Sequence, residues 1–297
     1  MFVRTVDCGN LSRAAAELGL SPAVASRRLA DLEAHLGTRL MHRSSRRLAL
    51  TESGQIYYTR CKQILEDLQE AEAIATENTV KPRGTLRLNV PVSFGIHQLG
   101  PLWAGFLARH PELMLSVSLN DRIVDLLEQG YDLGIRIARI ADSTLVAKKL
   151  AQTRIVCCAA PSYIARCGQP KTPEDLRHHA CLGYTHLNTR DEWIFYGTRD
   201  RAEKRVAIHS LMRADNGDTL RHAALAGAGI VLQPTFIVGQ DLKSGALVEL
   251  LPQYRSITFG VYAIYPTRKH VPVRVRLFVD YLSQAFGDDP QADPWGA

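Results

Sequence analysis

The chain has 297 residues, of which 46% are hydrophobic and 22% are charged, and these shares are typical of a globular protein. They exclude a disordered or collagen-like chain, while the length favours two or three domains. The net charge of +6 favours a polyanionic partner. This charge is concentrated near the start: residues 1–62 carry ten basic and five acidic residues, whereas residues 66–77 are acidic.

The first predicted elements are two short helices joined by a tight turn. Residues 11–19 predict a helix with Ser12 as its N-cap, and residues 21–36 predict a second helix that begins with Ser21 and Pro22. Such a pair forms a helix-turn-helix, whose second helix can lie in the major groove of DNA, although an ordinary helical hairpin is the alternative. Small or basic residues at the front of the second helix are the candidate DNA contacts: Ser21, Pro22, Ala23, Ser26, Arg27 and Arg28.

A basic hairpin is predicted directly after these helices. Residues 38–50 contain two short β-like runs that flank a cationic tip. Beside a helix-turn-helix, such a hairpin is a wing that can reach phosphates or the minor groove. The tip adds four candidate DNA contacts: Arg43, Ser44, Arg46 and Arg47.

These residues resemble the winged head of LysR-type transcriptional regulators. The resemblance rests on the run from Leu11 to Glu33, on Leu36-Gly-Thr-Arg-Leu40, on Arg43 and on Leu50-Thr-Glu-Ser-Gly54, and similarity in order and length continues to about residue 286. It implies a DNA-binding regulator, not an enzyme, that is switched by a small-molecule effector. Members of this family usually have another turn or two of helix before the segment that begins here at Phe2. The resemblance therefore implies that this chain begins inside its first helix.

A long helix is predicted after Thr51, since residues 55–78 contain neither proline nor glycine. Its apolar residues are spaced by four and three positions, which is the 3.5-residue period of a coiled coil. Packing of this stripe within its own domain is the alternative, whereas the family resemblance favours an antiparallel dimer of linker helices. The candidate dimer contacts are Tyr57, Cys61, Ile64, Leu68, Ala71 and Ala75.

The remainder of the chain alternates between predicted strands and helices, which indicates a parallel or mixed α/β sheet covered on both faces. Helices are predicted over residues 96–109, 123–128, 219–226 and 273–286. By resemblance, this region has the two-lobed fold of periplasmic binding proteins. The resulting domains are a winged helix-turn-helix at 1–50, a linker at 51–80, an effector domain at 85–286 (lobe one 85–159 and 266–286, lobe two 160–265) and a tail at 287–297.

The candidate effector site lies at strand ends, because ligands of open α/β sheets bind beyond the carboxyl ends of the strands. Helix starts after two of these ends offer N–H groups to an anion, and a third end carries an arginine that can hold a carboxylate through two hydrogen bonds. The candidate effector contacts are Ser93, Phe94, Arg136, Ile137, Asn216 and Gly217.

Each of these residues also has a structural alternative. Ser93 can serve as a helix cap, Asn216 as a turn former, and Arg136 as the partner of a carboxylate such as Asp132. If they bind an effector, we expect a small organic acid whose apolar part is covered by Phe94.

Other functions are less well supported by the sequence. The glycines in residues 226–231 follow a helix rather than a strand, which is the wrong order for a nucleotide site, and we expect no cofactor. The spacing of His178, His179, Cys167 and Cys181 matches no standard metal site. A two-lobed enzyme with a basic head would need a poised acid, base and nucleophile, and a solute-binding protein would need an export signal. A thiol-based redox sensor of the same architecture is the remaining alternative. We expect the protein to be cytoplasmic.

Overall fold

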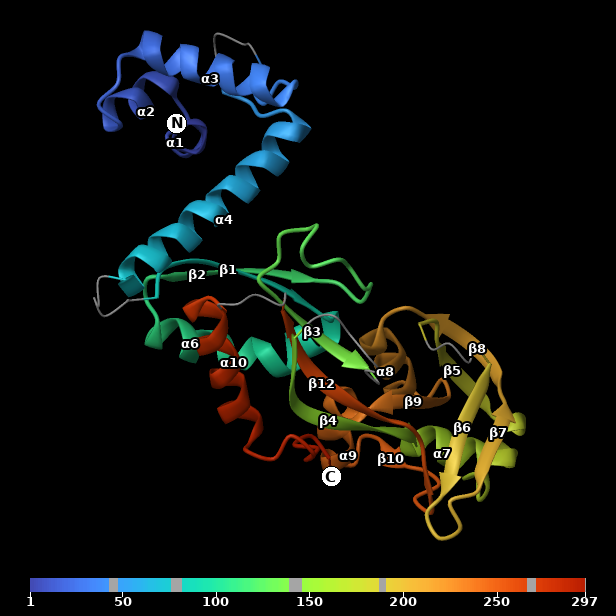
Figure 1. Ribbon diagram of the computed structural model, residues 1–297. Coiled ribbons are helices and arrows are strands. Elements are labelled where there is room, and N and C mark those ends of the chain that lie inside the picture. Colours follow the sequence, from blue (N-terminus) through green and yellow to red (C-terminus); the bar gives the residue numbers. More distant parts are fainter. Residues whose placement is uncertain (43–47, 76–81, 139–145, 187–190, 266–270, 297) are drawn as a thin grey trace. The chain divides into compact units, whose positions relative to one another are not determined.

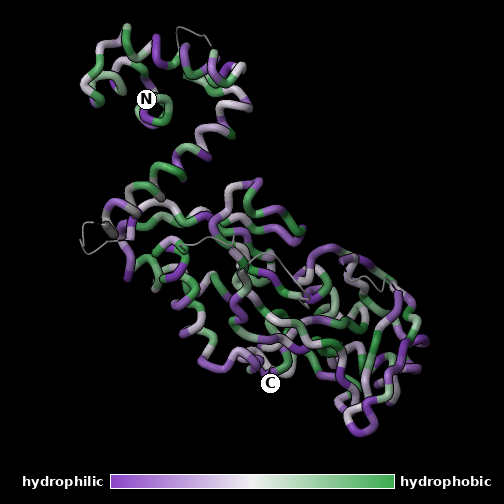
Figure 2. The backbone as a smooth tube through the Cα atoms, viewed as in Figure 1, coloured by the Kyte–Doolittle hydropathy of each residue, from purple (hydrophilic) through white to green (hydrophobic). Residues whose placement is uncertain are grey.

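The computed structural model describes residues 1–42, 48–75, 82–138, 146–186, 191–265 and 271–296 (Figure 1). The chain divides into two compact units, Met1–Lys81 and Pro82–Ala297. Hydrophilic and hydrophobic residues alternate along the N-terminal helices (Figure 2), as expected for helices with one buried face.

Three short helices form the head of the first unit: α1 (Phe2–Asp7), α2 (Leu11–Glu17) and α3 (Pro22–Leu36). The predicted start of α3 is confirmed, since the hydroxyl of Ser21 accepts a hydrogen bond from the main-chain N–H of Val24 at 3.3 Å. The predicted cap of α2 is wrong. Asn10, rather than Ser12, caps α2, because its extended backbone lets its side chain accept from the N–H of Arg13 at 3.1 Å.

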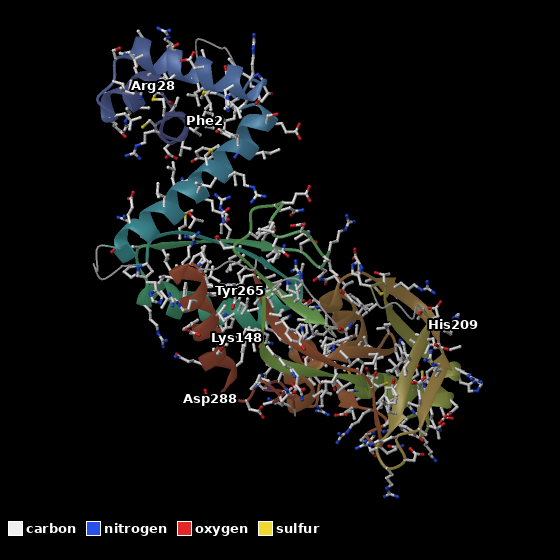
Figure 3. All side chains as sticks on the ribbon, viewed as in Figure 1. Phe2, Arg28, Lys148, His209, Tyr265 and Asp288 are labelled. Carbon is white, nitrogen blue, oxygen red and sulfur yellow. The ribbon has the colours of Figure 1, made fainter. Side chains whose placement is uncertain are left out.

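The long helix α4 (Glu52–Ala75) is tied to the head at its first turn. The hydroxyl of Thr51 donates to the main-chain oxygen of Arg39 at 2.7 Å and accepts from the N–H of Gly54 at 2.9 Å. Phe2, labelled in Figure 3, is buried in the head together with Leu40 and Met41. The motif at residues 50–54 therefore fastens the helix to the head.

The second unit contains a nine-stranded mixed sheet and a separate three-stranded sheet. The first sheet contains β1 (Gly84–Val90), β2 (Leu113–Leu119), β3 (Leu133–Ala138), β4 (Val146–Ala159), β5 (Ala180–Tyr184), β8 (His209–Ala214), β9 (Ile230–Pro234), β10 (Val248–Glu249) and β12 (Thr258–Tyr265). Its strand order is β2-β1-β3-β12-β4-β9-β5-β8, with β10 paired to β4. The second sheet contains β6 (Glu192–Gly197), β7 (Glu203–Ala207) and β11 (Tyr254–Arg255).

Strand β4 joins two halves of the large sheet, which we call lobe one and lobe two. Its first part pairs with β12, up to Arg154 opposite Thr258, and its last part pairs with β9, from Ile155 opposite Pro234. Lobe one thus contains β1, β2, β3 and β12, and lobe two contains β5, β8, β9 and β10. This differs from the expected boundary after residue 265, because β12 pairs with β3 and so belongs to lobe one.

Helices pack around this sheet (Figure 1). The α-helices are α5 (Val92–Phe94), α6 (Trp103–Arg109), α7 (Pro161–Cys167), α8 (Gly217–Leu225), α9 (Thr235–Ser244) and α10 (Val273–Phe286), and the other helical turns are η1 (Gly95–Leu99), η2 (Gly100–Leu102) and η3 (Pro173–His178). The last predicted helix, 273–286, is confirmed.

Two other predicted helices differ from the structure. Residues 96–109 form π, 3-10 and α turns in succession, and Pro101, which has no N–H to donate, lies where a continuous helix would need one. Residues 123–128 form no helix. Instead, the Asp125 carboxylate accepts from the N–H of Glu128 at 2.9 Å, and the backbone turns at Gly130 with a φ of 72°.

The segment after α10 packs back on the domain. The ring of Trp295 lies edge-on to Phe94, Phe236 and Phe286, with centroids 5.5–6.1 Å apart. The Asp293 carboxylate accepts from the Thr235 hydroxyl at 2.8 Å and from the N–H of Arg154 at 3.0 Å. This segment therefore joins α9 to the strand that links the lobes.

Candidate functional site

The predicted DNA-reading face of α3 is exposed. All six of its candidate residues are on the surface of the first unit: Ser21, Pro22, Ala23, Ser26, Arg27 and Arg28. Within the described part of the chain, neither Arg27 nor Arg28 (labelled in Figure 3) has a carboxylate partner. Both guanidinium groups are thus available to phosphates or base edges.

The base of the predicted wing is present next to α3. Met41 and Leu50 form a β-bridge, and the N–H of His42 donates to the main-chain oxygen of Ala49 at 2.9 Å. The Glu33 carboxylate on α3 accepts from the N–H groups of Leu40 and Met41 at 2.8 and 3.1 Å, so it fixes the start of the hairpin. The predicted contacts at the tip lie outside the described residues: Arg43, Ser44, Arg46 and Arg47.

The predicted dimer stripe on α4 divides into two parts. Tyr57 packs on its own head, with its ring 5.6 Å from that of Phe2, and Cys61 is half-buried. Farther along, Ile64 and Leu68 are 64% and 52% exposed. The side chains of the last two predicted contacts, Ala71 and Ala75, lie outside the described ones. Among the side chains of the stripe that the structure describes, only those beyond Cys61 present exposed apolar surface.

A cavity of about 270 Å³ is lined by both lobes of the second unit. Its size suits a small molecule, being near the lower end of ligand pockets. Four of the six predicted effector contacts line it: Ser93, Arg136, Ile137 and Gly217. The strand ends that the sequence indicates therefore do meet at one cavity.

The other two predicted contacts do not line it. Phe94 is fully buried in the core, where its ring packs against Phe236, Phe286 and Trp295, and so it cannot cover a ligand. The side-chain oxygen of Asn216 caps α8 by accepting from the N–H of Thr219 at 3.1 Å. The expectation for Phe94 is wrong, and the side chain of Asn216 serves as a helix cap rather than as the turn former of its structural alternative.

Arg136 is the half-buried cation of the cavity. Its Nη1 donates to Oδ1 of Asn89 at 2.7 Å and to the main-chain oxygen of Ile135 at 3.0 Å. Burial lowers the pKa of its guanidinium. The alternative pairing with Asp132 is wrong, because Asp132 pairs with Arg274 at 3.1 Å. Among the described residues Arg136 has no carboxylate partner, so its charge can serve an anion.

Several cavity residues lie outside the predicted set. Apolar side chains form much of the wall: Ile123, Ile155, Leu232, Phe236, Ile237 and Phe259. Polar side chains include Gln233, Arg122 and Tyr184, and burial raises the pKa of the Tyr184 phenol, which is therefore neutral at pH 7. Tyr184 and Leu232 lie at the ends of strands that the sequence predicts, over residues 181–184 and 230–232, and this position is the cue by which they could have been found.

A hydrogen bond links the lobes beside the cavity. Nε2 of His97, after lobe-one strand β1, lies 2.6 Å from Oδ1 of Asp218 on α8. Burial acts to raise the pKa of Asp218, but hydrogen bonds from His97 and Ser93 and the charges of His97 and Arg221 outweigh it, so this pKa is lowered. The pair is positioned to fix one arrangement of the lobes.

The thiols offer little support for a redox or metal centre. Burial raises the pKa of Cys157 and Cys158, and it raises the pKa of Cys181 to about 12, which disfavours the reactive thiolate. Cys167 is exposed, and no two described cysteines are bonded to each other. No cluster of metal-ligating side chains occurs among the residues with described positions. In those residues, no helix is long and apolar enough to cross a membrane.

Two family profiles match the chain. The profile described as "Bacterial regulatory helix-turn-helix protein, lysR family" matches residues 1–55, and "LysR substrate binding domain" matches residues 80–287.

Relatives match over almost the whole length. An uncharacterized HTH-type transcriptional regulator of Haemophilus influenzae is 38% identical over 275 residues, which cover 93% of this chain and 95% of that protein. The regulator CrgA of Neisseria meningitidis is 33% identical over 290 residues, covering 97% and 96%. The solved structure of CrgA matches with a TM-score of 0.63, and that of full-length AphB from Vibrio cholerae (26% identical) with 0.62. Each match covers 95% of this chain and 96% of the other.

Proposed function

The chain belongs to the LysR family of transcriptional regulators, which bind operator DNA and small-molecule effectors, and from this premise we propose how its own residues perform both tasks. It is a DNA-binding regulator with an effector-binding domain, not an enzyme. We propose that α3 and the wing bind the operator, that α4 pairs with a second copy, and that an organic acid in the cavity switches the protein. Because the operator lies in the bacterial cytoplasm, we propose that location.

The exposed face of α3 supports the proposed DNA contacts. Ser26 and Arg27 face solvent near the start of a helix whose length and flanking turn suit the major groove. Arginine can donate two hydrogen bonds to one guanine, so Arg27 is the proposed base contact. Arg28 and the arginines of the wing tip, Arg43, Arg46 and Arg47, are proposed to meet phosphates, with Ser21, Pro22, Ala23 and Ser44 beside them.

The exposed stripe on α4 supports a dimer. Ile64 and Leu68 are large apolar side chains, more than half exposed, on one helix of the first unit. Apolar surface of this kind gains stability when it is removed from water, and a second copy of the same helix offers a matching stripe. Two joined heads can then bind two halves of one operator. Since this stripe would be buried within each dimer, a homotetramer or larger assembly would need a further surface.

The observation that carries the effector proposal is the guanidinium of Arg136 in an otherwise largely apolar cavity. Hydrogen bonds to Asn89 and to Ile135 hold it, yet no described carboxylate neutralises it. A small organic acid would pair its carboxylate with this charge and place its apolar part against side chains such as Ile155 and Phe259. The difference between its affinities for two arrangements of the lobes would set how far the effector shifts the equilibrium between them.

Thermal-shift screening of small carboxylates tests this proposal. We expect at least one to raise the melting temperature of the wild type and to lose most of this effect with Arg136→Ala, which removes the charge. Arg136→Lys, which keeps the charge without the planar fork, should respond to an intermediate degree. Equal stabilisation of the wild type and Arg136→Ala would show that Arg136 is structural. A screen in which only cations bind would contradict the organic-acid proposal.

A further inference from the structure

Gln233 is a buried polar residue in the wall of the cavity. It is the fourth residue of β9 and is only 2% exposed, yet its side chain lines the cavity together with those of Leu232, Phe236 and Ile237. A glutamine among apolar neighbours is costly to bury unless its carboxamide forms hydrogen bonds. The bonding of this carboxamide therefore bears on what the cavity holds.

The amide nitrogen of Gln233 has no hydrogen-bond partner among the described residues. A second glutamine nearby provides a direct comparison. Nε2 of Gln98 donates to the main-chain oxygen of Phe236 at 2.7 Å. The fold thus satisfies the amide of Gln98, whereas that of Gln233, which shortly precedes Phe236 in the sequence, has no such acceptor among the described residues. Nearly all buried donors in proteins are paired, so this amide, like that of Asn89 beside Arg136, can serve an acceptor from outside the chain.

The glycine at position 217 makes room beside this carboxamide. A Cβ atom there would lie 2.5 Å from Cδ1 of Ile237, 3.1 Å from Oε1 of Gln233 and 3.6 Å from Oγ of Ser93. The backbone of Gly217 does not adopt a positive φ, so space rather than conformation favours glycine. Gly217 lines the same cavity, and a side chain at this position would fill space beside the carboxamide oxygen of Gln233.

One oxygen of each nearby carboxylate already has another partner, whereas Oδ2 of Asp218 is buried without a partner among the described residues. Oδ1 of Asp121 accepts from the N–H of Val92 at 2.9 Å, and Oδ1 of Asp218 accepts from His97. We propose that Gln233 is a specificity-determining residue whose Nε2 donates to an oxygen acceptor of the effector. This inference rests on the proposed effector role of the cavity. It adds a neutral hydrogen-bond donor, the carboxamide of Gln233, to the charge of Arg136 as a second group that recognises the effector.

The first test needs no ligand. If the amide of Gln233 is unused by the fold, Gln233→Leu should not lower the melting temperature of the full chain, and we expect a rise of about 2–4 °C. The matched control is Gln98→Leu, which removes a formed hydrogen bond and should lower it. A fall for Gln233→Leu as large as that for Gln98→Leu would overturn the inference, because the fold itself would then use this amide.

The second test measures binding of benzoate, benzamide and toluene, which share a ring and differ in acceptor and charge. We expect benzoate to bind the wild type, and Gln233→Leu to weaken it by roughly 10- to 100-fold, the usual effect of one hydrogen bond to a charged group. Gln233→Glu should weaken benzoate further by charge repulsion. Toluene should bind Gln233→Leu at least as well as the wild type, since it has no acceptor.

The outcomes separate this inference from the function on which it rests. Equal binding of benzoate to the wild type and Gln233→Leu would overturn the role of Gln233 while leaving the anion proposal intact. If benzamide binds, benzoate does not, and Gln233→Leu weakens benzamide, the anion proposal fails and the role of Gln233 stands. Failure of all three probes to bind at millimolar concentration would contradict both.

Discussion

The two functional regions of this regulator differ in how their residues are brought together. On α3, the proposed DNA contacts fall within eight consecutive positions, from Ser21 to Arg28. The cavity draws on residues from Pro91 to Phe259 and on both lobes. The first surface depends on one helix with its own caps, whereas the second depends on the register of a whole sheet. Substitutions should therefore act locally in the head and over long distances in the effector domain.

The largest expected effect is in the first unit, at Gly54 in the first turn of α4. A Cβ atom at this position would overlap the main-chain oxygen of Leu40, so Gly54→Ala must push α4 away from the head. Because the obstacle is a main-chain atom rather than a flexible side chain, we expect a cost above the ~1–3 kcal/mol that is usual for overpacking. We expect lost operator binding with an intact effector domain, measured by fluorescence anisotropy and thermal-shift ligand binding. Ser53→Ala, an exposed neighbour, should bind like the wild type; normal binding by Gly54→Ala would show that α4 can move without cost.

Trp295 tests whether contacts between residues far apart in the sequence stabilise the effector domain. Its ring contacts Phe94, Phe236 and Phe286, which come from three separate helices or their ends. Trp295→Ala should destabilise this domain by roughly 3 kcal/mol, toward the low end for large-to-small aromatic changes. Denaturant unfolding, with the exposed Pro294→Ala as control, measures this. An unchanged unfolding midpoint would mean that this segment does not contribute to stability.

A smaller change in binding is expected at the dimer stripe. Leu68→Asp places two charges together in the proposed seam, and the loss of two joined heads should weaken operator binding by roughly 100-fold. Analytical ultracentrifugation should show dissociation. The matched control is Ile56→Asp, since Ile56 is 60% exposed but off the stripe. If Leu68→Asp sediments and binds as the wild type does, the stripe has another role.

The same contrast explains how much the sequence predicts. Helix α3 is correctly bounded because its signals are local: Ser21 at the cap, Pro22 at the first position and Gly37 at the end. The match of α10 to residues 273–286 has a similar origin, with Pro272 before its start and Gly287 after its end. Helix α9 is flanked in the same way, by Pro234 before its start and Gly245 after its end, but its first turns are almost entirely apolar and show no helical period, so the sequence does not predict it.

The cavity is predicted only in part, for a physical reason. Strand ends predict that Arg136 and Gly217 lie where a ligand binds, and both line the cavity. Which way a neighbouring side chain points depends on packing, so Phe94 lies in the core and the carboxamide of Asn216 is used as a cap. Gln233 precedes a proline in an apolar run, and only the folded arrangement reveals its unpaired amide.

The central claim is that a small organic acid in the cavity controls operator binding through Arg136. The most direct measurement is the operator affinity of the full chain, on a duplex obtained by selection in vitro, with and without a carboxylate that stabilises the wild type. We predict that the carboxylate changes the affinity of the wild type and leaves that of Arg136→Ala unchanged, while both bind the duplex equally well without it. An identical change in both proteins, or no change in the wild type, would contradict the claim.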